Sequence, residues 1–142
     1  MNRSILSVVA GAATLLAACS AAPPQPAPEP FFTAPVVDVR GNERAGEYWE
    51  TKFAWGRYRP TMVPSDREPC WFAKIDFIID SNGNVFNPEI VEIRPDERFA
   101  RDALRMLAMN EYTPAETNPD RVPVHSTVTL EIKVQGHSCD PE

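Results

Sequence analysis

Residues 73–93 read AKIDFIIDSNGNVFNPEIVEI, and this stretch decides the fold. Apolar and polar side chains alternate over 73–80, which is the pattern of a strand with one buried face. The Asn-Gly pair at 82–83 separates this run from a second apolar run over 85–93, and such a pair is a strong hairpin signal. Pro88 indicates that the second strand lies at a sheet edge or carries a bulge. The stretch therefore predicts an antiparallel hairpin.

A helix and a third strand are predicted after the hairpin. Asp96 is a suitable N-cap for a helix over about 96–109. Its apolar positions recur at helical spacing and are Phe99, Ala103, Met106 and Leu107. The positions expected on its solvated face are Arg98, Arg101, Asp102 and Arg105. Thr113-Pro114 ends what remains of the helix, and alternation over 128–134 predicts the third strand, so the order is β-β-α-β.

The first residues have the features of an export signal. Arg3 precedes an apolar stretch over 5–16 that is too short to span ~30 Å of hydrocarbon as a helix. Leu16-Ala17-Ala18-Cys19 follows and resembles the bacterial lipoprotein box, which implies that Cys19 becomes the lipidated N-terminus. Ser20 in place of Asp favours sorting to the outer membrane, with the domain facing the periplasm of a Gram-negative bacterium. The alternative is an ordinary secretory signal with no lipid.

Composition and punctuation divide the chain into five parts. Its 142 residues allow one domain plus a tail, and a net charge of −6 argues against nucleic-acid binding. The predicted parts are a signal peptide (1–18), a lipidated Pro-rich tether (19–35), an aromatic-rich linking segment (36–59), a folded domain (60–137) and a tail (138–142). In polyproline II geometry the tether would reach roughly 50 Å at most.

The linking segment begins with a short strand candidate at 36–39. An amphipathic helix is plausible after it, because Trp49 and Phe53 are four residues apart. Its aromatic residues are Tyr48, Trp49, Phe53, Trp55 and Tyr58. We expect them to cover the sheet of the following domain, since large aromatic side chains are rarely exposed together; an exposed binding surface is the alternative.

The order of these pieces resembles the C-terminal domain of the TonB family over roughly residues 60–135. The matching pieces are Phe77-Ile78-Ile79-Asp80 with Gly83, Val85, Phe99 with Ala103-Leu104, Tyr112-Thr113-Pro114-Ala115, Pro123-Val124 and the strand from Val128 to Val134. Two positions depart from the family pattern. Asn110 stands where a Trp is usual near the helix end, and Arg121 or Val122 stands where a Gly is usual before Pro-Val.

The resemblance implies a small α+β domain in which one helix packs on a three-stranded antiparallel sheet. A right-handed crossover from the second strand to the third skips one position, so the strand order is 2-1-3. The third strand is then an edge that can accept an extended peptide main chain to main chain, as the TonB family does with outer-membrane receptors. The partner-binding residues predicted there are Val128, Thr129, Leu130, Glu131, Ile132, Lys133, Val134 and Gln135. The alternative is an edge protected by Lys133, by a disulfide or by residues 36–58.

Cys70 and Cys139 remain if Cys19 is lipidated. The strand order places the start of the first strand beside the end of the third, so a disulfide between these two cysteines is expected in an oxidising compartment. Two free thiols, or Cys139 with His137 as half of a metal site, are the alternatives.

The chain lacks a recognisable catalytic or cofactor motif. Asp80, Asn82 and Asn84 have calcium-loop spacing, but Val85 and Val91 occupy positions that require Gly and Glu. We therefore expect no enzyme activity, no cofactor and no metal.

Three functions fit this sequence. The first is a non-enzymatic envelope lipoprotein that binds a protein partner, an outer-membrane receptor being one candidate. The second is an energy transducer or accessory of TonB-dependent transport. The third is a structural lipoprotein that binds peptidoglycan or an envelope assembly machine.

Overall fold

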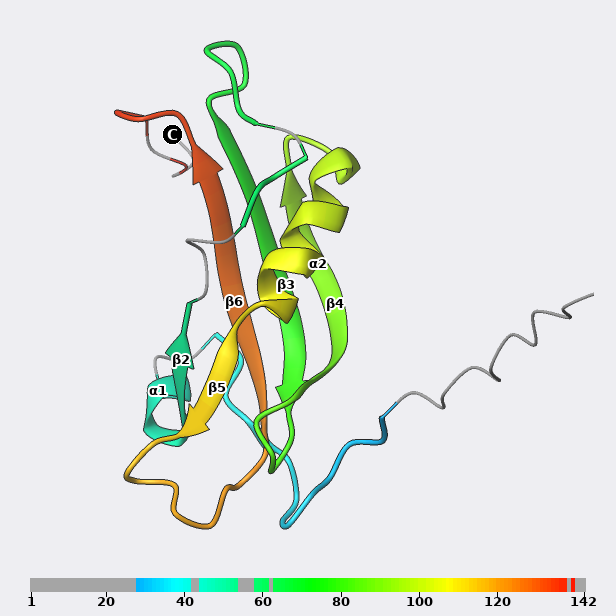
Figure 1. Ribbon diagram of the computed structural model, residues 1–142, viewed down its shortest axis with the longest axis vertical. Coiled ribbons are helices and arrows are strands. Elements are labelled where there is room, and N and C mark those ends of the chain that lie inside the picture. The colour runs from blue at the N-terminus through cyan, green and yellow to red at the C-terminus, as the bar shows by residue number, and fades with distance from the viewer. Residues whose placement is uncertain (1–27, 42–43, 54–57, 62, 138, 140–142) are drawn as a thin grey trace, which may run out of the picture.

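A continuous antiparallel ladder between two ten-residue strands forms the centre of the domain (Figure 1). The computed structural model describes residues 28–41, 44–53, 58–61, 63–137 and 139. In chain order the elements are β1 (Val37–Asp38), α1 (Ala45–Tyr48), β2 (Trp49–Lys52), β3 (Cys70–Ile79), β4 (Val85–Arg94), the 3-10 turn η2 (Glu97–Phe99), α2 (Ala100–Ala108), β5 (Glu111–Pro114) and β6 (Val124–Lys133).

The main sheet has the strand order β1-β6-β3-β4, and β2 and β5 form a separate antiparallel pair. The part β4-β3-β6 has the order 2-1-3 that the sequence predicts, which is confirmed. The expected three-stranded antiparallel sheet is wrong in one respect, because β1 adds to β6 as a parallel fourth strand. A two-residue parallel strand leaves no periodic signal in the sequence, so its partner was not predictable.

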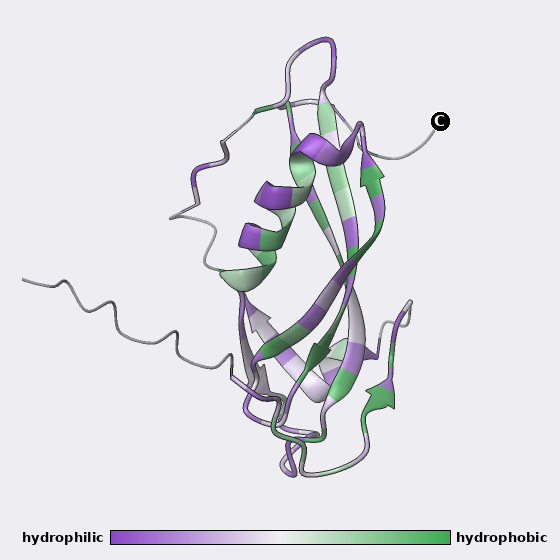
Figure 2. Cartoon of the chain, turned by 90° about the vertical axis from the view of Figure 1, so that its right-hand side faces the viewer, coloured by the Kyte–Doolittle hydropathy of each residue, from purple (hydrophilic) through white to green (hydrophobic). Residues whose placement is uncertain are grey.

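One face of the sheet carries the core. Every second side chain of β3 is at most 3% exposed, and these side chains lie beneath η2 and α2. The buried residues of the turn and helix are Phe99, Asp102, Ala103, Met106 and Leu107. Figure 2 shows α2 on this face, with hydrophilic residues along its outward side.

The predicted helix is confirmed, except for the environment of one residue. The side chain of Asp96 accepts a hydrogen bond from the main-chain N–H of Arg98 and so caps η2. Asp102 does not lie on the solvated face, because it is only 1% exposed. Its carboxylate accepts hydrogen bonds from the N–H (2.9 Å) and hydroxyl (3.0 Å) of Thr61, which belongs to the segment ahead of β3.

The linking segment is part of the folded domain. The helix expected there amounts to a single turn, because the residues after Tyr48 are extended in β2 and pair with β5 instead. Trp49 is 3% exposed, and Tyr48 and Tyr58 pack against the core. Phe53 is 57% exposed, so it does not cover the sheet as expected.

The chain segment before β1 is fixed to the β3–β4 turn. Asp80 and Ser81 in this turn are at most 1% exposed. The N–H of Phe31 donates to the carboxylate of Asp80 (3.1 Å), and the N–H of Ser81 donates back to the carbonyl of Phe31 (2.9 Å). The N–H of Thr33 donates to the hydroxyl of Ser81 (2.9 Å). We call this set of contacts the N-terminal clasp.

The predicted signal peptide and the lipidation of Cys19 lie outside the described residues. In the part of the chain that the structure describes, no helix is long and apolar enough to cross a membrane.

Candidate partner-binding edge

The outer edge of β6 is only partly paired. The N–H of Val37 donates to the carbonyl of Pro123 (3.0 Å), and the N–H of Val39 donates to the carbonyl of His125 (2.9 Å). Main-chain groups of a strand alternate between its two sides, so the residues that follow His125 at every second position also point outward. These residues are Thr127, Thr129, Glu131 and Lys133, and among the described residues none of their main-chain groups has a hydrogen-bond partner on that side. We call this row the open edge.

The predicted binding residues fall into two sets. The main-chain groups of Val128, Leu130 and Ile132 are directed towards β3, so these residues offer no main-chain hydrogen bond to an added strand. Thr129, Glu131 and Lys133 do present their main chain outward. Val134 and Gln135 follow the end of β6, and the N–H of Val134 donates to the carbonyl of Pro69.

The regular β3 ladder supports the open edge. All ten residue pairs between β3 and β6 follow one register. By contrast, β4 on the far side of the sheet has two register shifts against β3, a proline at position 88 and a positive φ of 48° at Asn87. Bulges and prolines of this kind hinder the addition of a further strand. β6 is therefore a more regular edge than β4 for the addition of another strand.

Side chains of β6 give the two faces of the open edge different chemistry. On the helix side, Leu130 is fully buried, and Val128 and Ile132 pack against the core. On the opposite side, Lys133 and Glu131 form a solvent-exposed ion pair (3.8 Å) of little energetic weight. An added strand would therefore meet apolar side chains on one face and polar ones on the other.

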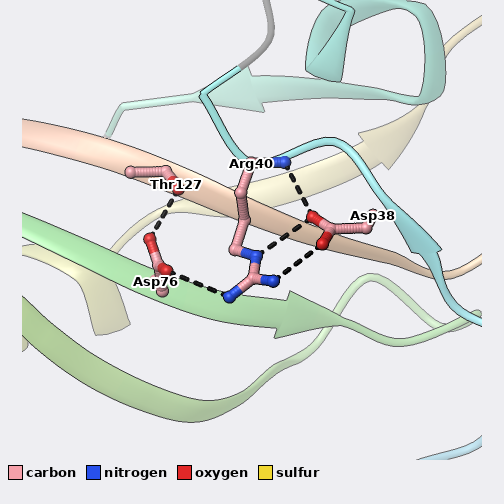
Figure 3. A network of polar contacts seen from close by, with 4 residues as sticks. All are labelled: Asp38, Arg40, Asp76 and Thr127. Atoms are coloured by element: carbon pink, nitrogen blue, oxygen red, sulfur yellow. Dashed lines mark hydrogen bonds and ion pairs between the residues drawn. The ribbon is translucent and has the colours of Figure 1, made fainter.

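Arg40 fastens β1 to the sheet at the boundary of the open edge (Figure 3). Its guanidinium donates to both carboxylate oxygens of Asp38 (3.0 and 2.7 Å) and to Asp76 on β3 (3.4 Å). The hydroxyl of Thr127 donates to the second oxygen of Asp76 (2.6 Å). We call these four residues the β1 latch. Beside them lies a shallow polar pocket of about 490 Å³ that also includes Lys74.

The latch perturbs the ionisation of its members. Hydrogen bonds from the side chain and then the main chain of Arg40 hold the pKa of Asp38 well below its ordinary value. The same pairing raises the pKa of Arg40. Both groups are therefore charged at neutral pH, and the Arg40–Asp38 pair is exposed to solvent.

A disulfide between Cys70 and Cys139 lies at the end of the ladder opposite to β1, with a Cα–Cα distance of 5.4 Å. These are the two cysteines that the strand order brings together. Because Cys139 is in this bond, it is not a thiolate ligand beside His137. Among the described residues no group of three or more His, Cys, Asp or Glu side chains is placed to hold a metal ion.

Asp80 has the role of a turn residue. It accepts hydrogen bonds from the main-chain N–H groups of Asn82 (2.9 Å) and Asn84 (2.8 Å), which closes the hairpin.

The two departures from the family pattern have visible consequences. Arg121 has a φ of +53°, the conformation that a glycine adopts without strain. Asn110 is 8% exposed, and its amide has no hydrogen-bond partner among the described residues. The substitution at the helix end therefore leaves a buried polar group where an aromatic ring would pack.

Sequence pattern alone does not indicate the β1 latch or the N-terminal clasp. Asp38, Arg40 and Asp76 are brought together only by the parallel addition of β1. The alternation of Asp38 and Arg40 on one side of a short strand was the only local signal.

The comparisons with known proteins agree with the topology. The family model described as Gram-negative bacterial TonB protein C-terminal matches residues 73–133. This range runs from the body of β3 to the end of β6 and includes α2 and β5. The comparison with curated proteins found no match. The matched family is one of periplasmic domains that interact with proteins. The matched range does not include β1, α1 or β2. With the order β4-β3-β6 and one helix on the core face, residues 73–133 form a TonB C-terminal-like module.

Proposed function

We propose that this chain is a non-catalytic outer-membrane lipoprotein whose TonB C-terminal-like module binds an envelope protein by adding an extended segment of that protein along β6. The observation that carries the proposal is the pairing of β1 with β6. The edge already accepts one extended segment by main-chain hydrogen bonds, and no described residue pairs with the outward main-chain groups of the four residues beyond it.

The energetics of such an addition favour a short and reversible contact. Each main-chain hydrogen bond contributes about 1 kcal/mol net, and ordering a flexible peptide opposes this gain. Apolar side chains of the added strand would gain further free energy beside Val128 and Ile132, which pack at the core margin. Attachment of both proteins to one membrane raises their effective concentration, so a weak contact suffices.

A proline substitution tests the main-chain contact directly. The N–H of Thr129 faces outward, so Thr129→Pro removes a donor from the open edge and none from the β3 ladder. We expect Thr129→Pro to lower partner capture at least tenfold. Thr129→Val is the matched control, because it keeps the N–H and is expected to leave capture unchanged. Thermal melts of both variants check that each is folded.

The partner is identified by crosslinking in intact cells. A photoreactive residue at Thr129 is expected to label an envelope protein, which mass spectrometry then names. The same residue at Glu89, an exposed position on β4, is the control. No labelling at Thr129, or equal labelling at both positions, would contradict strand addition at β6.

Lipidation needs its own measurement. The chain is expected to incorporate labelled palmitate and to fractionate with the outer membrane. Cys19→Ser should abolish the incorporation, and a wild-type chain without acyl mass would rule out the anchor.

A further inference from the structure

Two adjacent phenylalanines are held in solvent by a fixed backbone. Phe31 is 53% exposed and Phe32 is 43% exposed, although the main chain of Phe31 and of Thr33 is bound in the N-terminal clasp. Phe31 uses both its N–H and its carbonyl in that clasp. The exposure of these rings is therefore not a result of a loose segment. We call Phe31 and Phe32 the aromatic pair.

The residues that hold the aromatic pair are buried. Asp80 is 0% exposed and Ser81 is 1% exposed. The hydroxyl of Thr33 adds a hydrogen bond to the carbonyl of Asp120 (3.2 Å), so the clasp joins the β3–β4 turn and the loop before β6. A buried carboxylate is costly unless its hydrogen bonds are satisfied, and the clasp supplies one of them. The segment is thus firmly attached to the domain.

The aromatic pair lies at one end of the molecule. Figure 1 shows the segment that carries it beside the turn between β3 and β4, at the lower end of the sheet, with the C-terminal end of β6 at the top. The disulfide is at that upper end, next to the first residue pair of the β3–β6 ladder. Val36, which is 37% exposed, adds a third apolar side chain just before β1.

The predicted lipid anchor at Cys19 is close in sequence to the aromatic pair, so the bilayer is the surface that this end of the molecule can reach. Cys19 is nine positions before Pro28, where the described residues begin. Phe31 and Phe32 lie 12 and 13 positions after Cys19, and at ~3.1 Å per residue in polyproline II geometry this separation reaches roughly 40 Å at most. A surface tethered so close meets the bilayer at a high effective concentration, so even a small apolar contact is populated.

We propose that the aromatic pair rests in the interface of the bilayer to which Cys19 is anchored. This inference rests on the lipidation that belongs to the proposed function. The ionisable residues in this segment and the clasp are Glu29, Asp80, Asp120 and Arg121, three acidic residues and one basic one, so the proposed contact is apolar and needs no anionic lipid. It orients the domain with the β3–β4 turn towards the lipid and the open edge away from it.

Quenching by brominated lipid tests the contact. The acylated full-length protein, with its acyl mass established first, is reconstituted into phosphatidylcholine vesicles with and without brominated chains. Phe31→Trp and Phe32→Trp are compared with Val63→Trp, because Val63 is an apolar residue that is 68% exposed in the loop before β3. The signal of the unsubstituted protein, which contains three Trp residues, is subtracted.

We expect brominated lipid to quench the tryptophan at position 31 or 32 at least twofold more than the one at 63, with no change between low and high salt. Equal quenching at all three positions would overturn the proposal, and so would quenching at none. A protein without acyl mass would overturn it as well.

A second measurement tests whether the aromatic pair instead forms a contact between two copies of this chain. The Cys19→Ser versions of the same variants are diluted without lipid. Concentration-dependent emission from position 31 or 32 would assign the aromatic pair to self-association and overturn the proposal. Partner capture by Thr129→Pro does not depend on either result, so failure here is distinct from failure of strand addition.

Discussion

At the scale of single residues, Arg121 occupies a backbone conformation that costs an L-residue free energy. Its φ is +53°, and it lies two positions before Pro123 in the loop that leads into β6. The left-handed region costs a non-glycine residue about 1–2 kcal/mol. The resemblance to the TonB family had marked this turn as altered, and the dihedral angle shows how.

Arg121→Gly is expected to stabilise the protein. Relief of the strain exceeds the extra chain entropy of glycine in the unfolded state, so the free energy of unfolding should rise by about 0.5–1 kcal/mol. Urea denaturation measures the change. Arg67→Gly is the matched control, because Arg67 has no positive φ, and it should not stabilise. A loss of stability in Arg121→Gly would contradict the assignment.

Asp102 illustrates the limit of reading charge from sequence. Helical spacing and an ionisable side chain predict a solvated position, but the segment before β3 covers it and supplies both donors of Thr61. This contact joins residues 41 positions apart in sequence, and no local pattern encodes it.

Asp102→Ala should therefore be strongly destabilising. The substitution leaves buried donors without an acceptor, which costs about 3 kcal/mol. Chemical denaturation is the measurement, and Arg101→Ala is the neighbour control, with an expected change within about 0.5 kcal/mol. Similar losses in the two variants would argue against the buried role.

At the scale of elements, the sequence predicts those whose signal is local. The strand alternation of β3 and β6, the Asn-Gly turn and the apolar spacing of α2 are each encoded within a dozen neighbouring residues, and all four were confirmed. β2 and β5 are four-residue strands whose paired residues are 59 positions apart for Lys52 with Glu111 and 65 for Trp49 with Pro114. Only tertiary contacts select their extended form over the helix that Trp49 and Phe53 suggested.

The open edge was predictable only in outline. The strand order required β6 to lie beside β3 with its other side unpaired. Cover by residues 36–58 was the stated alternative, and β1 realises it only over Val124 and His125. The strand order did not indicate that Thr127 would join the open edge. The outward direction of a main-chain group depends on register, and a one-residue shift reverses it.

The β1 latch predicts a pH dependence. Ionised Asp38 is stabilised by Arg40, so the latch is complete above the ordinary carboxyl pKa of 3.8 and is lost as the pH falls through the lower value in the folded protein. Arg40→Gln should raise the pKa of Asp38 towards 3.8, and NMR titration measures it. Amide exchange at Val37 and Val39 should accelerate in the same variant, because β1 is less firmly held.

Arg98→Gln provides the control for this titration. Arg98 lowers the pKa of Asp96 by the same kind of hydrogen bond, at a site away from β1. The pKa of Asp96 should rise while that of Asp38 stays low. An unchanged Asp38 in Arg40→Gln would remove the basis of the latch.

At the scale of the whole molecule, the disulfide closes a loop that contains almost all of the core. Cys70 and Cys139 are 69 positions apart. In the chain-entropy model, a loop of this length stabilises the folded state by about 4 kcal/mol. The bond therefore supplies a large part of the stability of a domain this small.

The double variant Cys70→Ser/Cys139→Ser should lose about 4 kcal/mol in free energy of unfolding. The difference in free energy of unfolding is measured by urea denaturation of the oxidised wild type and of the double variant. Reduced wild type serves as the internal check and should match the double variant. Equal stability of the oxidised and reduced proteins would show that the cross-link adds nothing.

The position of this bond also determines how β6 would respond to mechanical load. A partner that pulls on a segment docked beside Thr129 transmits tension into β6. Strands separate most easily when they are peeled from one end, one residue pair at a time, and the bond joins Cys139, six residues beyond the end of β6, to the first residue of β3. Tension is then shared by ten residue pairs in shear. If the proposed partner pulls on the module in this way, the docked contact would therefore separate before the domain unfolds.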